Sequence, residues 1–250
     1  DMKGLNREDI FQMIGRKEMQ KLYGLESAGL LVKKGGYLFP RLICKEMTSH
    51  PNINISYNHC FDGWQKRKSK IEIKFLNQNT KKNFDDLIIA NGPGLGKFLP
   101  GLKISKGQLV GLRGSQSIDL ELPVNSAGYI LPKIDEITWI GATNEKEFQD
   151  LEIGYEAGND LIARTNKNFN IDLVGVKDML MEARIRVGSK DRLPLAGPIE
   201  KNVYAIGALG SRGFTLGPIL GEYIASLINN SPMPISGGVA LAIDPLRFKG

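Results

Sequence analysis

The sequence predicts an α/β fold in which a mostly antiparallel domain is inserted into a parallel-sheet layer. Two apolar runs, within residues 85–96 and 203–210, each end in glycines. Such runs are typical of strands buried inside a parallel sheet. An amphipathic segment at 217–228, apolar at helical spacing, follows the second run. Between the runs lie short alternating segments, which favour antiparallel strands.

Composition is that of an ordinary globular chain. The 250 residues are 42% hydrophobic and 24% charged, which permits one large domain or two small ones. No apolar run approaches the ~20 residues of a membrane span, and no secretory signal opens the sequence. Cys44 and Cys60 form no CxxC pair. We therefore expect a cytoplasmic protein whose two thiols are free and buried.

The segment before the first apolar run mixes helix and strand signals. Residues 6–24 predict a helix, and 28–40 predict a strand, a turn and a second strand. Pro40 is suited to begin a helix through residue 48, because its fixed φ matches the first helical turn. Alternation predicts three further short strands, at 53–57, 61–65 and 70–76. Turn residues occupy 77–80.

The segment after the first run is strand-like with one helix. The amphipathic helix is expected over 154–169. Strands are expected at 106–114, 128–134, 137–143 and 182–189. This is the pattern of a nucleotide-binding α/β layer with a second domain inserted in it.

The glycine loop at 92–98, GPGLGKF, matches neither common phosphate-binding motif. Lys97 stands where GxGxxG needs its third glycine. A P-loop would need glycine at Asn91 and a hydroxyl residue at Phe98. A strand-end turn with close backbone contact is the better interpretation.

The loop at 207–217, GALGSRGFTLG, is more informative because a strand enters it and a helix leaves it. Glycines let the backbone approach a planar ligand. The helix start, expected at 217–218, offers unpaired N–H groups and a positive dipole end to an anionic or partly anionic group. A flavin ring fits this description. The alternative is a tight connector whose Arg212 is only solvated.

Arg186 is the second candidate. In EARIRVGS (182–189) the apolar Ala183, Ile185 and Val187 share one face, so Arg184 and Arg186 share the other. A solvent-facing strand explains this pattern. An arginine fork is also the best side chain for a bidentate grip on a carboxylate.

A basic stretch accounts for part of the net charge of +6. One explanation is that these basic residues form the solvent-exposed face of a surface hairpin. The alternative is that they contact a nucleic acid. The members of this stretch are Lys66, Arg67, Lys68, Lys70, Lys74, Lys81 and Lys82.

Two C-terminal motifs resemble those of D-amino-acid-oxidase-type flavoproteins. They are RVGSKDRLPLAGP (186–198) and VYAIGALGSRGFTLGPILGEYIASLI (203–228), with weaker matches at GGYLFP (35–40) and KGQLVGL (106–112). LGSRGF, YNHCF (57–61) and DPLRF (244–248) are most similar to the oxidoreductase half of the tRNA-modifying MnmC branch. The resemblance spans nearly the whole chain.

The resemblance implies an FAD enzyme that oxidises an amine carbon by hydride transfer to flavin N5. In the MnmC branch the substrate is 5-carboxymethylaminomethyl-uridine in tRNA, whose carboxymethyl arm leaves as glyoxylate. Arg186 would grip the carboxylate of that arm, with Arg212 nearby. Phe61 would lie on the adenine side of FAD. The cofactor contacts implied are Phe61, Gly92, Gly207, Gly210, Ser211, Arg212, Gly213, Phe214 and Thr215.

The sequence departs from the family at its start, where the strand, GxGxxG loop and helix that cradle the FAD pyrophosphate are absent. We therefore expect a partial Rossmann-like FAD-binding layer from residues 1–100 and 191–250, and a substrate domain from 101–190. The methyltransferase half of MnmC is absent as well. Whether this chain alone holds FAD stays open. The alternatives are a glycine- or sarcosine-type oxidase of a free amine, and a flavin-free fragment that binds RNA.

Overall fold

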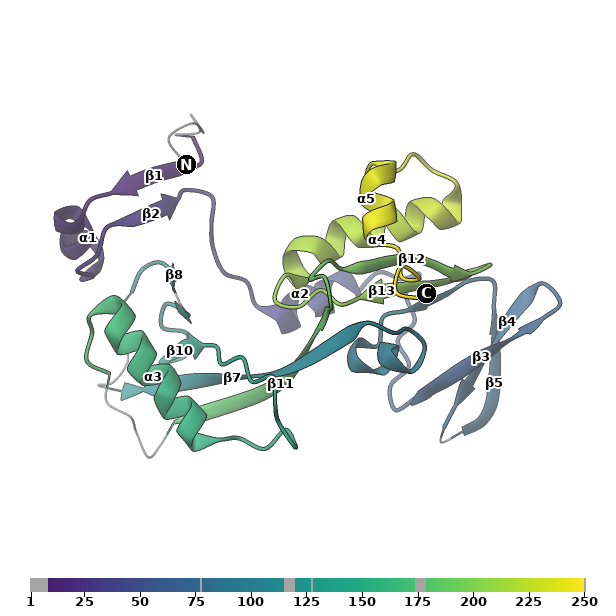
Figure 1. Ribbon diagram of the computed structural model, residues 1–250, viewed down its shortest axis with the longest axis horizontal. Coiled ribbons are helices and arrows are strands. Elements are labelled where there is room, and N and C mark those ends of the chain that lie inside the picture. Colours follow the sequence, from purple (N-terminus) through teal and green to yellow (C-terminus); the bar gives the residue numbers. More distant parts are fainter. Residues whose placement is uncertain (1–8, 77, 115–119, 127, 174–178, 250) are drawn as a thin grey trace. The chain divides into compact units, whose positions relative to one another are not determined.

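The structure, a computed structural model, describes residues 9–76, 78–114, 120–126, 128–173 and 179–249 (Figure 1). Two compact units divide the chain. Unit 1 comprises Asp1–His50 and Lys106–Arg184, and unit 2 comprises Pro51–Ser105 and Ile185–Gly250. Residues 106–184 thus group with the first fifty residues of the chain. The functional division into FAD-binding and substrate domains stays a prediction.

Unit 1 is built on antiparallel sheets. A hairpin pairs β1 with β2, and a five-stranded sheet has the order β11-β7-β10-β9-β8, with β7 and β11 continuing across the unit boundaries. Its helices are α1 (Arg16–Tyr23), α2 (Pro40–Met47) and α3 (Tyr155–Phe169). Its strands are β1 (Phe11–Ile14), β2 (Gly29–Val32), β7 (Leu102–Arg113), β8 (Val124–Asn125), β9 (Tyr129–Ile130), β10 (Ile137–Gly141) and β11 (Leu180–Ser189).

The core of unit 1 forms where α3 packs on the five-stranded sheet. Leu161 and Ile162 of the helix are buried with Val110 of β7 and Ile140 of β10. The buried residues of α3 fall at helical spacing, which confirms the helix predicted over 154–169; they are Gly158, Leu161, Ile162, Thr165 and Phe169.

Two predictions for the first forty residues are wrong in detail. The helix expected over 6–24 is a strand, β1, followed by the shorter α1 after Gly15. Pairing of β1 with β2 outweighs local helix propensity there. The second strand expected before Pro40 is absent from the described residues, whereas Pro40 does begin α2.

Unit 2 contains two three-stranded sheets, ordered β12-β13-β6 and β3-β4-β5. No strand forms at 53–57. The strands are β3 (Phe61–Arg67), β4 (Lys70–Phe75), β5 (Gln78–Phe84), β6 (Leu87–Ile89), β12 (Leu195–Glu200) and β13 (Val203–Gly207). The helices are the 3-10 helix η2 (Gly92–Lys97), α4 (Gly213–Asn229) and α5 (Gly237–Ala242).

The β12-β13-β6 sheet is the middle layer of unit 2. One face packs on α4, where Ala196 is buried with Leu220 and Ile224 (Figure 1). The other face packs on β4 and η2, where Val203 and Ala205 are buried with Leu95. Alternate residues of β12 and β13 therefore enter different cores, as the period of a β-strand requires.

The parallel pairing predicted for the two apolar runs is confirmed. β13 pairs with β6 in parallel, with Val203 opposite Leu87 and Ala205 opposite Ile89. Burial on both faces of β6 is wrong, because Ile88 is 48% exposed. Mixed helix and strand content with inserted antiparallel sheets confirms the predicted fold class.

Candidate active site

Both glycine loops lie at one edge of the β12-β13-β6 sheet. Because β6 and β13 run parallel and in register, the loops that follow them leave from the same side. Ligands of open α/β sheets bind outside the carboxyl ends of the strands. Gly92 and Gly210 have φ of 59° and 57°, which L side chains rarely adopt. This edge is therefore the candidate ligand site.

The glycines of this edge divide into two kinds. A Cβ built at Gly207 would lie 2.7 Å from Cδ2 of Leu95, so this glycine lets η2 pack closely against β13. A Cβ built at Gly92, Gly210 or Gly213 would meet no atom within 4 Å. The backbone at these three positions is therefore open to an incoming ligand, as a flavin ring requires.

Helix α4 begins inside the glycine loop, four residues before the expected start. Arg212 is its N-cap, and the N–H groups of Thr215 and Leu216 donate to the Arg212 carbonyl at 3.1 and 2.9 Å. The N–H groups of Gly213 and Phe214 precede these bonds and have no partner inside the helix. Pro218 lies within the helix rather than at its first turn. The positive end of the helix dipole therefore falls among the predicted cofactor residues.

The first turn of α4 is accessible. Ser211, Arg212 and Thr215 are exposed, and the Phe214 side chain is 47% exposed. Together with the unbonded N–H groups, these residues suit the electron-rich edge of a bound flavin. The residues present thus fit FAD at this edge, though none of them replaces a pyrophosphate-binding GxGxxG loop.

Arg186 lies beside this edge. Its strand, β11, alternates as predicted: Ala183 and Val187 are buried, Arg184 is exposed and Arg186 is half-buried. The N–H of Gly210 donates to the carbonyl of Val187 at 2.8 Å. This bond joins the glycine loop to the residue that follows Arg186 in β11. The carboxylate contact predicted for Arg186 stays a prediction.

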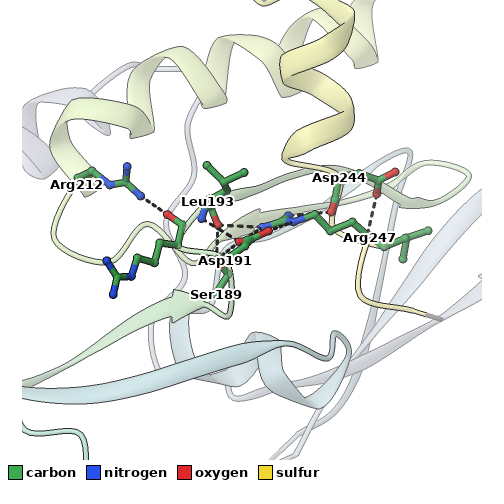
Figure 2. A network of polar contacts seen from close by, with 8 residues as sticks. Ser189, Asp191, Leu193, Arg212, Asp244 and Arg247 are labelled. Carbon is green, nitrogen blue, oxygen red and sulfur yellow. Dashed lines mark hydrogen bonds and ion pairs between the residues drawn. The ribbon is translucent and has the colours of Figure 1, made fainter.

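Arg212 contacts the turn that follows β11. Its Nη2 donates to the carbonyl of Arg192 (Figure 2). That turn is held by Asp191, which accepts hydrogen bonds from two groups of its own segment and from Arg247. Hydrogen bonds from Arg247 lower the pKa of Asp191 well below its usual range, and those from Ser189 Oγ and the Leu193 N–H add to this effect.

Phe61 packs within an aromatic cluster of unit 2. Its ring lies nearly parallel to that of Trp64, with centroids 6.4 Å apart, and 5.6 Å from the ring of Phe98. Trp64 Nε1 donates to Glu200 at 3.1 Å. Lys97 of η2 bonds to Asp62, so the cluster ties β3 to the loop after β6. The adenine contact predicted for Phe61 stays a prediction.

An open cavity of about 1150 Å³ lies within unit 1. Four aromatic side chains line it, together with the ion pair between Arg184 and Glu182, whose Nη2 and Oε2 atoms are 3.2 Å apart. The aromatic residues are Tyr37, Phe39, Tyr129 and Trp139. The sequence matched GGYLFP to a family but gave no signal that these rings share a cavity, because they come from separate elements.

The basic stretch is partly neutralised. Lys66 pairs with Glu200 at 3.2 Å, Arg67 with Glu72 at 3.6 Å and Lys70 with Asp85 at 2.5 Å. These pairs support the interpretation as a solvated hairpin face. The side chain of Lys81 lies outside the described residues.

Two predictions on the wider chemistry can be compared with the structure. Cys44 and Cys60 are free as expected, but both are exposed, so their predicted burial is wrong. Among the residues that the structure describes, no helix is long and apolar enough to cross a membrane.

Comparisons with known proteins identify the family of the chain. The family model described as FAD dependent oxidoreductase, DAO, matches residues 2–227. The tRNA 5-methylaminomethyl-2-thiouridine biosynthesis bifunctional protein MnmC of Campylobacter jejuni subsp. doylei is 26% identical, with 98% of this chain and 46% of that protein covered. The chain thus spans about half the length of this relative.

Solved structures share the fold. The glycine oxidase of Geobacillus kaustophilus matches with a TM-score of 0.80 and 16% identity, over 100% of this chain and 70% of that one. The iminodiacetate oxidase of Chelativorans sp. BNC1 matches with a TM-score of 0.75 and 17% identity, over 98% and 69%. Because the family model matches residues 2–227, which is most of the sequence, the chain belongs to the DAO family of FAD-dependent oxidoreductases.

Proposed function

We propose that this chain takes part in FAD-dependent removal of the carboxymethyl group from 5-carboxymethylaminomethyl-uridine in tRNA. The observation that carries this proposal is the bond from the Gly210 N–H to the Val187 carbonyl, which sets Arg186 beside the glycine edge. A cation for a carboxylate and an open backbone for a flavin then belong to one site. Similarity to MnmC proteins, whose name refers to tRNA, supports the nucleic-acid substrate.

Each group of the site has a defined task in this proposal. FAD, when bound, would supply the hydride acceptor for oxidation of the methylene carbon next to the amine. Arg186 binds the carboxylate of the arm with a two-pronged hydrogen bond. The arm is thereby oriented so that its C–H bond faces the cofactor, and positioning supplies most of the catalysis. A neutral amine needs no strong protein base to lose hydride, and water then hydrolyses the oxidised arm to glyoxylate and a primary amine.

The division of labour along the chain is also part of the proposal. Residues 1–100 and 191–250 would bind FAD, and 101–190 would bind the substrate. The cavity of unit 1 suits a ligand with a planar ring, because aromatic side chains form much of its wall. The ion pair between Arg184 and Glu182 also lines it. We place the protein in the cytoplasm, where tRNA is modified and exposed thiols stay reduced.

The second candidate is a glycine- or sarcosine-type oxidase of a free amine. The matched folds of a glycine oxidase and an iminodiacetate oxidase favour it, because their named substrates carry the same glycine-like acid. A third possibility, a flavin-free RNA-binding fragment, has less support because three cations of the basic stretch pair with acidic residues.

Nucleoside analysis of treated tRNA tests the proposal. The chain, supplied with FAD, is incubated with tRNA that carries the carboxymethylated uridine, and the digested nucleosides are separated and weighed. Conversion to the aminomethyl nucleoside with matching glyoxylate release is expected. Turnover of glycine or sarcosine with unchanged tRNA would instead establish the second candidate. Salt-sensitive tRNA binding by a chain that holds no flavin would establish the third.

A further inference from the structure

The C-terminal segment grips the turn that follows the Arg186 strand. Arg247 donates from Nε to Asp191 Oδ2 at 2.8 Å and from Nη2 to Asp191 Oδ1 at 2.9 Å (Figure 2). Its Nη2 also donates to the Leu193 carbonyl at 3.0 Å, and its Nη1 to the Asp244 carbonyl at 3.0 Å. The Arg247 side chain is 13% exposed. A two-pronged, mostly buried pair of this kind fixes geometry as well as charge.

The segment 244–248 is seated by close backbone approaches. A Cβ built at Gly101 would lie 2.3 Å from Cδ2 of Phe248, and Gly101 has a φ of 81°. The Arg247 guanidinium lies 4.5 Å from the centroid of the Phe248 ring. The Ala196 N–H donates to the Ile243 carbonyl at 2.9 Å. The position of Arg247 is therefore set by packing on both sides of it.

The turn that Arg247 binds is connected to both candidate arginines, Arg186 and Arg212. Ser189, three residues after Arg186, donates from Oγ to Asp191 at 2.7 Å, and the Leu193 N–H donates to the same carboxylate at 2.9 Å. Arg192 has a φ of 66°, and its carbonyl accepts from Arg212. Hydrogen bonds, together with the peptide bond between Asp191 and Arg192, thus connect Arg247 to Arg212, the N-cap of α4.

We propose that Arg247 is a positioning residue, which acts through Asp191 to hold the Ser189–Leu193 turn and, through Arg212, the first turn of α4. The carboxylate site that this arrangement would serve rests on the proposed function. The mechanical coupling does not, because it follows from the contacts within unit 2 alone. Removing Arg247 is therefore expected to loosen a loop that it does not touch.

Hydrogen exchange tests the coupling. In Arg247→Met the backbone N–H groups of 189–193 and of 210–216 are expected to exchange faster than in the unchanged chain. Arg247→Lys keeps the charge but loses the fork, so a smaller increase in both segments is expected. Lys70→Met, which breaks the exposed ion pair with Asp85 in the same unit, is the matched control and should change neither segment. Faster exchange at 189–193 alone would overturn the proposal.

A measurement of carboxylate binding shows whether Arg247 positions the binding residues or only stabilises the fold. Glycolate is titrated calorimetrically into the folded chain at a temperature well below unfolding. Arg247→Met is expected to raise the dissociation constant about 2- to 30-fold, the usual range for a residue that acts at a distance. Arg247→Lys should recover part of the affinity, and Lys70→Met should match the unchanged chain.

The outcomes distinguish this proposal from the proposed function. If the unchanged chain fails to bind glycolate while exchange still spreads to 210–216, the positioning role stands and the carboxylate site fails. If glycolate binds and Arg247→Met alters neither exchange at 210–216 nor affinity, Arg247 has no positioning role. If Arg247→Met does not fold, the same comparisons are made with Arg247→Lys.

Discussion

Two residues are central to the ligand site proposed at the glycine edge. Arg186 is half-buried beside it, and Gly213 leaves the first turn of α4 open. A charge that is partly desolvated binds an acid more strongly than a fully solvated one. A glycine with space around it admits a ligand rather than a neighbouring side chain. Both features can be tested one residue at a time.

Arg186→Ala should weaken carboxylate binding by roughly 1.5–3 kcal/mol, the range for a hydrogen bond to a charged group. The dissociation constant for glycolate, and KM for the amine substrate, would rise accordingly. Lys201→Ala removes an exposed charge from the β12–β13 turn and serves as the control. Equal affinity in both variants would show that Arg186 faces solvent only.

Gly213→Ala should leave the fold intact and weaken FAD binding. The added methyl meets no atom within 4 Å, and alanine favours a helix over glycine by up to about 1 kcal/mol. Thermal unfolding is therefore expected at the same temperature or slightly above. Fluorescence quenching of added FAD would report the lost affinity. A variant that binds FAD as well as the unchanged chain would remove Gly213 from the cofactor site.

At the scale of elements, the parallel pairing of β6 with β13 brings the two glycine loops to the same edge of the sheet. The 3-10 helix η2, which lies in the first loop, packs against the end of β13. Gly207 makes this packing possible because Leu95, which is fully buried, occupies the space that a side chain would need. The C-terminal segment holds the turn after β11 in a similar way, through the contact of Arg247 with Asp191. The site is thus held by contacts among four separate stretches of unit 2.

Gly207→Ala is expected to destabilise the chain by about 1–3 kcal/mol, the usual cost of adding a methyl to a packed core. Chemical denaturation would show a lower midpoint. In contrast to Gly213→Ala, the loss should appear without any ligand. An unchanged midpoint would mean that η2 moves freely away from β13.

The Asp191–Arg247 pair predicts a pH dependence. Since the folded pKa of Asp191 is lowered, the pair stabilises the fold fully above about pH 4 and progressively less as the pH falls further. The difference in unfolding temperature between the unchanged chain and Arg247→Met should therefore be largest near neutrality and shrink below about pH 4. A difference that is constant from pH 7 to pH 3 would contradict the ion pair.

The sequence predicted the elements with strong periodicity and missed the contacts between distant ones. Helices α3 and α4 followed from apolar spacing, and the parallel strands from their unbroken apolar runs. The start of α4 was misplaced because the glycines of the 207–217 loop were assumed to precede the helix. The bond between Arg247 and Asp191 joins residues 56 positions apart, and no local pattern encodes such a pair.

At the scale of the whole molecule, the chain forms two units drawn from four stretches and covers about half of its curated relative. It covers about 70% of the solved oxidases that share its fold. Fold and family were predictable because two specific motifs, at 186–198 and 203–228, lie in unit 2. Substrate identity was not, because a tRNA arm and a free amino acid present the same acid group.

The central claim is that the glycine edge of unit 2 is the FAD site, and visible absorbance after dialysis against flavin-free buffer tests it most directly. The unchanged chain, mixed with FAD and dialysed, is expected to keep a flavin spectrum, and Gly213→Ala of equal thermal stability is expected to keep less. Equal retention by both would move the flavin site elsewhere. No retention by the unchanged chain would contradict the claim that this edge suffices, and would confine the oxidase activity to a longer polypeptide.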